Sequence, residues 1–345
     1  MLFMSNILHP APQKSIQISS HKSFAPKAVP IVPTVPIVPP PAFVLPFPRP
    51  PPTIPRMKTT LRPVDNLPST LALIRAALEE DLGGIGDVTS IALVPEGIPA
   101  AAEIVARHPM ALAGLPVAAK VFRTVDPAIS VTPLAADGDV LSAPAPVLRV
   151  EGPARSLLSA ERTALNFLQR MCGIATATRR LLDLVPPGSV QILDTRKTLP
   201  AYRRLDKYSV ACGGGTNHRM GLFDAVLIKD NHLAFWRQNA RGTLADAVRA
   251  ARAAFPALKI ELEVDTLDQL REALPARPDW VLLDNMPPAL LREAVALCAG
   301  ACKTEASGGI TAETLPAVAA TGVTAVSLGA LTHSVKAADL ALDFL

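Results

Sequence analysis

The second half of the chain alternates short apolar runs with longer amphipathic segments. Six apolar runs have the length of strands and fall at residues 190–193, 225–228, 258–262, 280–283, 301–304 and 324–327. Four segments between them carry apolar residues at helical spacing and cover residues 244–255, 266–274, 288–298 and 311–320. Strands that alternate with helices indicate βαβ units and a parallel sheet.

The pattern before this alternation predicts a smaller domain of mixed structure. Residues 69–80 have apolar side chains at helical spacing, and a long helix rich in Leu and Ala is expected over 156–183. Short alternating segments at 102–106, 129–132 and 147–150 predict a small mixed sheet. We therefore place a first domain at 65–168 and a second at 169–345, with the C-terminal residues able to pack back on the first.

The first 57 residues form a leader of a different kind. Fifteen of the 35 prolines fall within residues 1–55, and no acidic residue precedes Asp65. Because proline fixes φ and lacks an amide proton, we expect polyproline II or disorder there. Prolines also interrupt residues 29–47 too often for a membrane span. Three interpretations stay open: translation that starts at Met57, a disordered tail, and a targeting segment, although such prolines oppose the amphipathic helix of a transit peptide.

Composition narrows the class of protein only a little. Hydrophobic residues make up 49% of the chain and charged residues 19%, which excludes a wholly disordered protein. The four cysteines are too few and too scattered for a disulfide framework, so we expect a reducing compartment, the cytoplasm. The net charge of +4 permits an anionic ligand.

Polar residues follow each of the six predicted strands. The segments at these strand ends are Asp194–Lys197, Lys229–His232, Glu263–Asp265, Asp284–Asn285, Glu305–Gly309 and Gly329. One such segment would only mark where a strand emerges into solvent. Six in succession favour a barrel, whose βα loops form a site at one rim, over a doubly wound sheet with a single switch point.

The basic residues at this rim predict an anionic ligand. Arg196, Lys197, Arg219 and Lys229, with His218 beside them, would repel one another unless an anion lay between them. Arginine suits carboxylate and phosphate oxygens because its planar fork donates two parallel hydrogen bonds.

Other rim residues suggest a phosphate and a cation. Glu263 and Asp284 fit one of three partners: a Mg²⁺ ion that substrate phosphates also bind, the hydroxyl groups of a ribose, or a positive charge that develops during a reaction. The segments Ser307–Gly309 and Ser327–Gly329 follow the last two strands, where barrel enzymes often bind phosphate. The sequence has no cysteine and histidine pair with zinc spacing, no G-x-S-x-G elbow and no G-x-G-x-x-G fingerprint.

Six motifs together resemble the quinolinate phosphoribosyltransferase family, also called carboxylating nicotinate-nucleotide pyrophosphorylases (diphosphorylases). They are ERTALNFLQRMCGIA from Glu161, LDTRKTLP from Leu193, CGGGTNHRMGL from Cys212, AVLIKDNH from Ala225, EASGGI from Glu305 and SLGALTHS from Ser327. The resemblance covers about residues 71–345, and the leader has no counterpart.

The resemblance implies an α/β fold: an N-terminal α/β sandwich domain followed by an incomplete, open TIM-like α/β barrel of type II phosphoribosyltransferases. It implies a pentosyl-transferring enzyme of NAD biosynthesis that uses Mg²⁺. The reaction would join quinolinate to phosphoribosyl pyrophosphate and yield nicotinate mononucleotide, pyrophosphate and CO₂. The partners would be these two small molecules and a second copy in a head-to-tail homodimer, with a hexamer also open; no nucleic acid or membrane is expected.

The resemblance also assigns roles to residues of this sequence. The quinolinate-binding set would be Arg162, Thr195, Arg196, His218, Arg219 and Lys229, with Arg162 donated across the dimer. The catalytic residues and contacts to phosphoribosyl pyrophosphate and Mg²⁺ would be Lys197, Glu263 and Asp284, and Glu263 and Asp284 would bind the metal. The phosphate contacts would be Ser307, Gly308, Gly309, Ser327 and Gly329. Glu261 shares a strand face with Glu263 but lies below the rim, and a supporting role for His333 is as well founded as a direct one.

One position departs from the family, and three alternatives stay open. Ala201 follows Pro200 where the family usually has glycine; a positive φ there would strain alanine by about 1 kcal/mol or more. A paralogue such as the molybdenum-associated branch could act on another anionic ring, although the complete basic set weighs against it. Another phosphate-binding barrel enzyme would not explain so many cations, and a nucleic-acid-binding protein using the leader lacks any known binding module.

Overall fold

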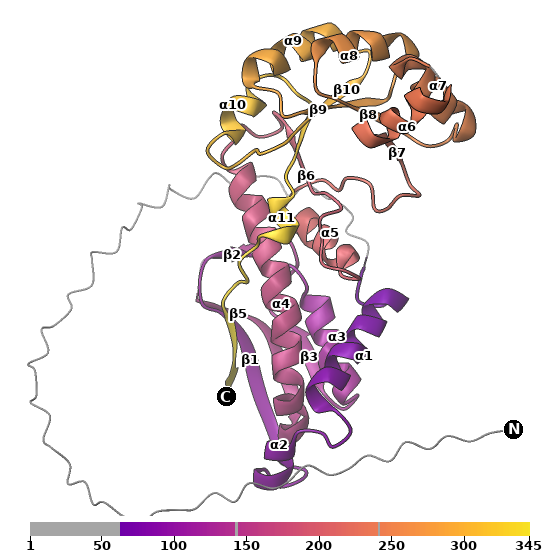
Figure 1. Cartoon of the computed structure of the whole chain (residues 1–345). Helices are drawn as coiled ribbons and strands as arrows, with labels where there is room; N and C mark the ends of the chain where they lie inside the picture. The colour runs from indigo at the N-terminus through magenta and orange to yellow at the C-terminus, as the bar shows by residue number, and fades with distance from the viewer. Residues whose placement is uncertain (1–62, 142–143, 241) are drawn as a thin grey trace, which may run out of the picture. The chain divides into compact units, whose positions relative to one another are not determined.

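The computed structural model describes residues 63–141, 144–240 and 242–345, and for Asn239 and Ala240 only the backbone. The expectations for the leader therefore lie outside the described residues. The described part contains an antiparallel sheet with its helices and a parallel sheet with its helices, and the long helix α4 (Ala154–Leu182) packs in both (Figure 1). None of the helices in the described segments is long and apolar enough to cross a membrane.

The antiparallel sheet has the strand order β12-β1-β5-β3. Its strands are β1 (Pro99–Ala106), β3 (Ser130–Pro133), β5 (Ala145–Pro153) and β12 (Leu340–Phe344), and a separate small pair joins β2 (Met110–Ala111) to β4 (Val140–Leu141). Three further helices accompany it: α1 (Pro68–Leu82), α2 (Val88–Leu93) and α3 (Leu115–Val125). Buried aliphatic side chains of the sheet and of α1, α3 and α4 form one core.

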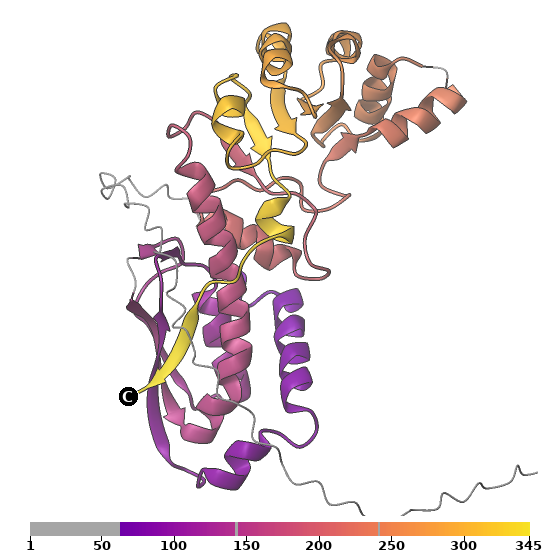
Figure 2. The same cartoon turned by 60° about the vertical axis from the view of Figure 1, so that its left-hand side comes forward.

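The end of the chain returns to this first sheet. β12 pairs antiparallel with β1, with Ile104 opposite Leu342 (Figure 2). On the way it crosses α4 at Gly173, where a Cβ atom would lie 2.4 Å from the carbonyl oxygen of Lys336. Only glycine permits this close approach, so the sequence of α4 itself determines where the tail passes.

The parallel sheet has the strand order β6-β11-β10-β9-β8-β7. Its strands are β6 (Gln191–Leu193), β7 (Val226–Ile228), β8 (Ile260–Val264), β9 (Trp280–Asp284), β10 (Lys303–Ser307) and β11 (Ala325–Ser327). β6 and β7 are the two edges, and within the described segments no strand closes the gap between them. The sheet is therefore the predicted incomplete, open α/β barrel.

Helices follow most of these strands and supply the second core. They are α5 (Arg203–Cys212), α6 (Asp230–Ala240), α7 (Leu244–Ala254), α8 (Leu267–Ala273) with the 3₁₀ turn Leu274–Ala276, α9 (Pro288–Cys298), α10 (Leu315–Ala319) and α11 (Ala330–His333). Figure 2 shows α7, α8, α9 and α10 along one face of the parallel sheet. The polar residues predicted for the site lie on the opposite face of this sheet and at the carboxyl ends of its strands.

The glycine run after α5 packs closely against α4. A Cβ atom at Gly213 would lie 2.4 Å from the carbonyl oxygen of Ala175, and one at Gly215 would lie 2.8 Å from Thr178 Cγ2. The glycines let the backbone after α5 approach α4, and Gly214 also has a φ of 93°.

Candidate active site

Two loops carry most of the predicted cations. The TRK loop (residues 194–200) follows β6, and the NHR loop (residues 216–225) leads into β7. The two run together at their start, where Thr216 N donates to Ile192 O at 2.8 Å and Asp194 N donates to Thr216 O at 3.3 Å. The sequence therefore brings Arg196 of one loop and Arg219 of the other to the same edge of the sheet.

A buried ion pair supports both loops from below. Asp194 is fully buried and accepts from Lys207 Nζ, which is 1% exposed. It also accepts from Asn217 Nδ2 at 2.6 Å and from the His218 amide at 2.9 Å. Burial raises the pKa of Asp194 and lowers the pKa of Lys207, while their opposite charges act against both shifts. The three donors around Asp194 favour its ionised form and so oppose the effect of burial on its pKa.

The two arginines lie close enough to influence each other. Burial lowers the pKa of Arg219, and the positive charge of Arg196 lowers it further. Arg219 Nη1 donates to Ala225 O at 3.1 Å, whereas the buried Nε of Arg196 has no hydrogen-bond partner. Two half-buried cations that lower each other's stability suit an anion as their common partner.

Two predicted carboxylates lie at the ends of neighbouring strands. Glu263, at the rim end of β8, accepts from Lys229 Nζ at 2.9 Å. Asp284, at the end of β9, accepts from Asn285 Nδ2 at 2.6 Å. Each carboxylate is half-buried at a strand end. Two oxygen donors of this kind suit Mg²⁺, which is usually bound by one or two carboxylates together with substrate phosphates, so the residues fit the predicted ion.

Two of the predicted glycines leave no room for a side chain. A Cβ atom at Gly308, where φ is 95°, would lie 2.1 Å from Asn285 Oδ1. One at Gly329 would lie 3.0 Å from Lys197 Cδ and 3.0 Å from His333 Nε2. The structure therefore brings Lys197, Gly329 and His333 together. Thr332 Oγ1, next to His333, donates to Lys197 O at 2.7 Å and fixes the end of the TRK loop.

His218 lies at the centre of a buried acidic cluster. Its Nε2 is 3.1 Å from Glu261 Oε2 and 3.4 Å from Glu305 Oε2, and Glu305 is 1% exposed. The Oε1 atoms of both glutamates are buried without a partner. Burial lowers the pKa of His218, but hydrogen bonds to the two carboxylates outweigh this and raise it to about 10. Burial raises the pKa of Glu261.

His218, Glu261 and Glu305 lie close enough together to hold a metal ion. The hydrogen bonds of the His218 ring oppose this. The amide of Arg219 donates to His218 Nδ1 at 2.7 Å. With Nδ1 accepting, the ring carries its proton on Nε2, and that nitrogen donates between the glutamates. A metal-binding histidine uses one nitrogen as ligand and donates with the other. The amide opposes the doubly protonated ring, whereas the two carboxylates favour it and raise the pKa of His218.

Other predicted residues lie in the TRK loop, at strand ends and on α4. Thr195 Oγ1 accepts from the Lys197 amide at 3.0 Å, and Ser327 is buried at the end of β11. Gly309 follows β10 with a φ of 59° and open space around it. Arg162 lies on α4; its side chain is 59% exposed and comes within 3.9 Å of Glu161.

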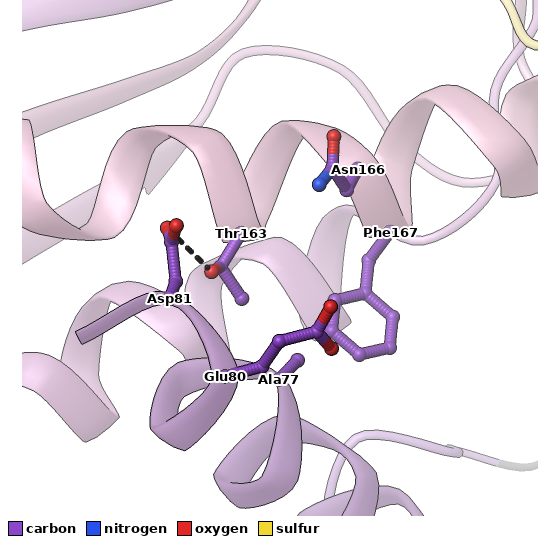
Figure 3. Close-up of a pocket in the computed structure, with 6 residues that line it drawn as sticks. All are labelled: Ala77, Glu80, Asp81, Thr163, Asn166 and Phe167. Carbon is purple, nitrogen blue, oxygen red and sulfur yellow. Dashed lines mark hydrogen bonds between the residues drawn. The ribbon is translucent and has the colours of Figure 1, made fainter. Parts of the chain in front are cut away.

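A pocket near Arg162 lies between α1 and α4. It is lined by Ala77, Glu80, Asp81, Thr163, Asn166 and Phe167 (Figure 3). Thr163 Oγ1 donates to Asp81 Oδ2 at 3.4 Å. None of the residues predicted to bind a ligand lines this pocket, although Arg162 directly precedes Thr163 in the chain.

Sequence reasoning missed several residues that organise the site. Arg203 and Lys207 of α5, Asn217 of the NHR loop and Glu305 of β10 all contact predicted site residues. Glu305 lies two residues before Ser307 and shares a strand face with it, which was the available signal. Arg203 and Lys207 are four apart on a helix that the apolar pattern did not reveal.

Comparisons with known proteins agree with this geometry. Two family models match: the quinolinate phosphoribosyl transferase N-terminal domain over residues 87–172 and its C-terminal domain over 174–343. The chain is 45% identical over 275 residues to the nicotinate-nucleotide pyrophosphorylase [carboxylating] of Mycobacterium leprae, covering 78% of this chain and 95% of that protein. It is 40% identical over 290 residues to the chloroplastic enzyme of that name from Arabidopsis thaliana, covering 79% and 81%.

A solved structure shows the same fold. The nicotinate-nucleotide pyrophosphorylase from Francisella tularensis superposes with a TM-score of 0.76 at 38% identity, covering 82% of this chain and 99% of that one. An open α/β barrel with a rim of cations, carboxylates and glycine turns defines the chain as a phosphoribosyltransferase of the quinolinate type. It belongs to the quinolinate phosphoribosyltransferase family.

Proposed function

We propose that the chain transfers the phosphoribosyl group of phosphoribosyl pyrophosphate to the ring nitrogen of quinolinate (pyridine-2,3-dicarboxylate), releasing pyrophosphate and CO₂ and yielding nicotinate mononucleotide. The observation that supports this most is the pairing of a cationic site between Arg196 and Arg219 with the carboxylates Glu263 and Asp284 at neighbouring strand ends. The first group suits a dianion, and the second suits the positive charge that develops on the ribose.

The chemistry follows from these charges. The cations hold both carboxylates of quinolinate, so that the ring nitrogen faces C1 of the ribose, which is mainly positioning. As the nitrogen bonds to C1, the C1–O bond breaks and its electrons leave with pyrophosphate. Glu263 and Asp284 stabilise the positive charge that appears on the ribose in between. The ring is then a pyridinium, which takes up the electrons of the bond to the departing C2 carboxylate, and C2 accepts a proton from water.

The remaining contacts concern the phosphates. Gly309 has open space where a Cβ atom would lie, so a phosphate can approach the backbone there, and Lys197 lies beside Gly329 at the end of the neighbouring strand. Mg²⁺ bound by Glu263 and Asp284 would neutralise pyrophosphate as it leaves. His218 contributes by orienting the NHR loop, since both of its ring nitrogens are used within the protein.

A product assay on the full chain tests this proposal. It contains quinolinate, phosphoribosyl pyrophosphate and Mg²⁺, and it follows CO₂ and nicotinate mononucleotide together. We expect equal amounts of both products, and no turnover when nicotinate replaces quinolinate. A folded protein without turnover would refute the proposed reaction and favour the paralogue that acts on another anionic ring. Loss of turnover on chelation, restored by Mg²⁺, tests the metal.

We also propose a homodimer in which Arg162 completes the partner's site, with a hexamer as a further assembly. The guanidinium of Arg162 is exposed on α4, whereas the other predicted cations belong to loops that follow or precede strands β6 and β7. This difference supports the shared site. Arg162→Ala and Lys197→Ala variants, each inactive alone, should regain activity when unfolded and refolded together, because a mixed dimer has one site with both residues. A mixture as inactive as its components would contradict the shared site.

The cytoplasm is the compartment that we propose. The proline density of the leader, which opposes the amphipathic helix of transit peptides, supports this, although the Arabidopsis relative is named as chloroplastic. Expression of the full chain with a C-terminal fluorescent protein would test it. Accumulation in an organelle would contradict the proposal.

A further inference from the structure

All three guanidinium nitrogens of one arginine near the site donate to the protein's own loops. Arg203, at the start of α5, donates from Nε to Thr198 Oγ1 at 3.1 Å and from Nη2 to Arg196 O at 3.3 Å. Its Nη1 donates to Met220 O at 3.1 Å. The first two acceptors belong to the TRK loop and the third to the NHR loop. This one side chain therefore bridges the two loops that carry the cations.

Lys207 makes the same connection one turn further along α5. Its buried ammonium donates to Asp194 of the TRK loop and, at 3.0 Å, to His218 O of the NHR loop. Residues four apart on a helix share one face, so Arg203 and Lys207 attach both loops to the same side of α5. Asn217 strengthens the attachment at Lys207, because its Nδ2 donates to Lys207 O at 2.7 Å and to Asp194.

We infer that Arg203 is a positioning residue that sets the distance between the TRK and NHR loops, and with it the separation of the cations that bind the two carboxylates of a vicinal dicarboxylate. This inference rests on the proposed function. Each loop supplies one of the arginines at the anion site, Arg196 and Arg219, so the spacing of the loops is the spacing of the two charges. Loop separation then discriminates a dicarboxylate from a monocarboxylate.

Arginine suits this role better than lysine would. A guanidinium has a rigid planar fork whose donors point to several acceptors at once, whereas an ammonium is a single point charge on a flexible stem. Lysine at position 203 could reach one loop but could not hold both at a fixed separation. Arg203 donates no hydrogen bond to the residues on β8, β9 and β10 that are predicted to contact phosphoribosyl pyrophosphate. Lys197 lies between the two TRK-loop acceptors of Arg203, but Thr332 Oγ1 also holds it by donating to Lys197 O at 2.7 Å.

The test compares Arg203→Ala, Arg203→Lys and Arg204→Ala. Arg204 is the exposed neighbour on the same helix, so its variant removes the same charge without touching the loops. Since a misplacement of about 1 Å can cost roughly a hundredfold, we expect kcat/KM for quinolinate to fall by ~10–100-fold in Arg203→Ala. The KM for quinolinate should rise far more than the KM for phosphoribosyl pyrophosphate. Arg204→Ala should match wild type.

Chemical rescue separates positioning from general destabilisation. Guanidinium chloride, well below denaturing concentrations, should restore part of the activity of Arg203→Ala by occupying the vacated space, and should not help Arg203→Lys. Thermal unfolding of each variant shows whether it is folded, and Arg203→Lys keeps the charge if Arg203→Ala does not fold. Equal loss for both substrates, no rescue, or behaviour like Arg204→Ala would overturn the inference. A wild type without turnover would instead refute the proposed function.

Discussion

Ala201 should make the protein less stable than glycine would at the same position. Its φ is 61°, in the left-handed region, and its side chain is exposed, so the methyl group gains no burial in return. The left-handed conformation costs an L-residue about 1–2 kcal/mol. Glycine avoids this cost but loses roughly 0.5–1 kcal/mol more in backbone entropy on folding. Ala201→Gly should therefore raise the free energy of unfolding by about 0.5–1 kcal/mol.

Urea unfolding of the full chain measures this difference. The midpoint should rise with an unchanged m-value, and the melting temperature should rise by ~1–4 °C. The matched control is Ala211→Gly within α5, where helical φ favours alanine and the change should cost about 0.5–1 kcal/mol. If both variants lost stability to the same extent, the strain assigned to position 201 would be refuted.

Three further predictions concern charge and reactivity. Lys197→Ala should lower turnover about a hundredfold or more while leaving the melting temperature unchanged, because this lysine is exposed; near-wild-type activity would refute its assignment. Replacing either Lys207 by Met or Asp194 by Asn should cost roughly 3–5 kcal/mol in urea unfolding, since one buried charge is left unpaired. In native protein a thiol reagent should modify Cys302 first, because a hydrogen bond from Cys298 lowers the pKa of Cys302. Burial raises the pKa of Cys172 to about 12, so that thiol should react late. Peptide mapping that found Cys172 modified first would contradict this.

The strands of the parallel sheet were the most predictable part of the fold. Runs such as 280–283 are buried on both sides of the sheet, so they read as continuous apolar segments wherever they lie in the chain. The helix expected at 311–320 was too long, because the chain after Gly309 turns before α10 begins at Leu315. Strand β12 was not recognised as a strand. Its pairing with β1 depends on where the tail crosses α4 at Gly173, and no local pattern contains that information.

The position of a residue could be predicted where its place in a strand determines it. Glu263 and Asp284 lie at strand ends, so their position at the rim follows from the parallel pairing. Arg203 and Lys207 could not be found in this way. Their role comes largely from backbone carbonyl groups of the loops on either side of α5, and the sequence records no hydrogen bond to a carbonyl.

The contact between Lys229 and Glu263 connects the two halves of the proposed site. In the free protein the ammonium and the carboxylate are 2.9 Å apart, so each partly neutralises the other. A carboxylate of quinolinate at Lys229 would compete with Glu263 for that ammonium, and this competition would return negative charge to Glu263 beside the ribose. Occupying the anion site would thereby strengthen the group that stabilises the positive charge of the reaction. Under the proposed function, the carboxylate beside Lys229 would then take part in the mechanism, and the charge of the substrate would offset the cost of separating the pair.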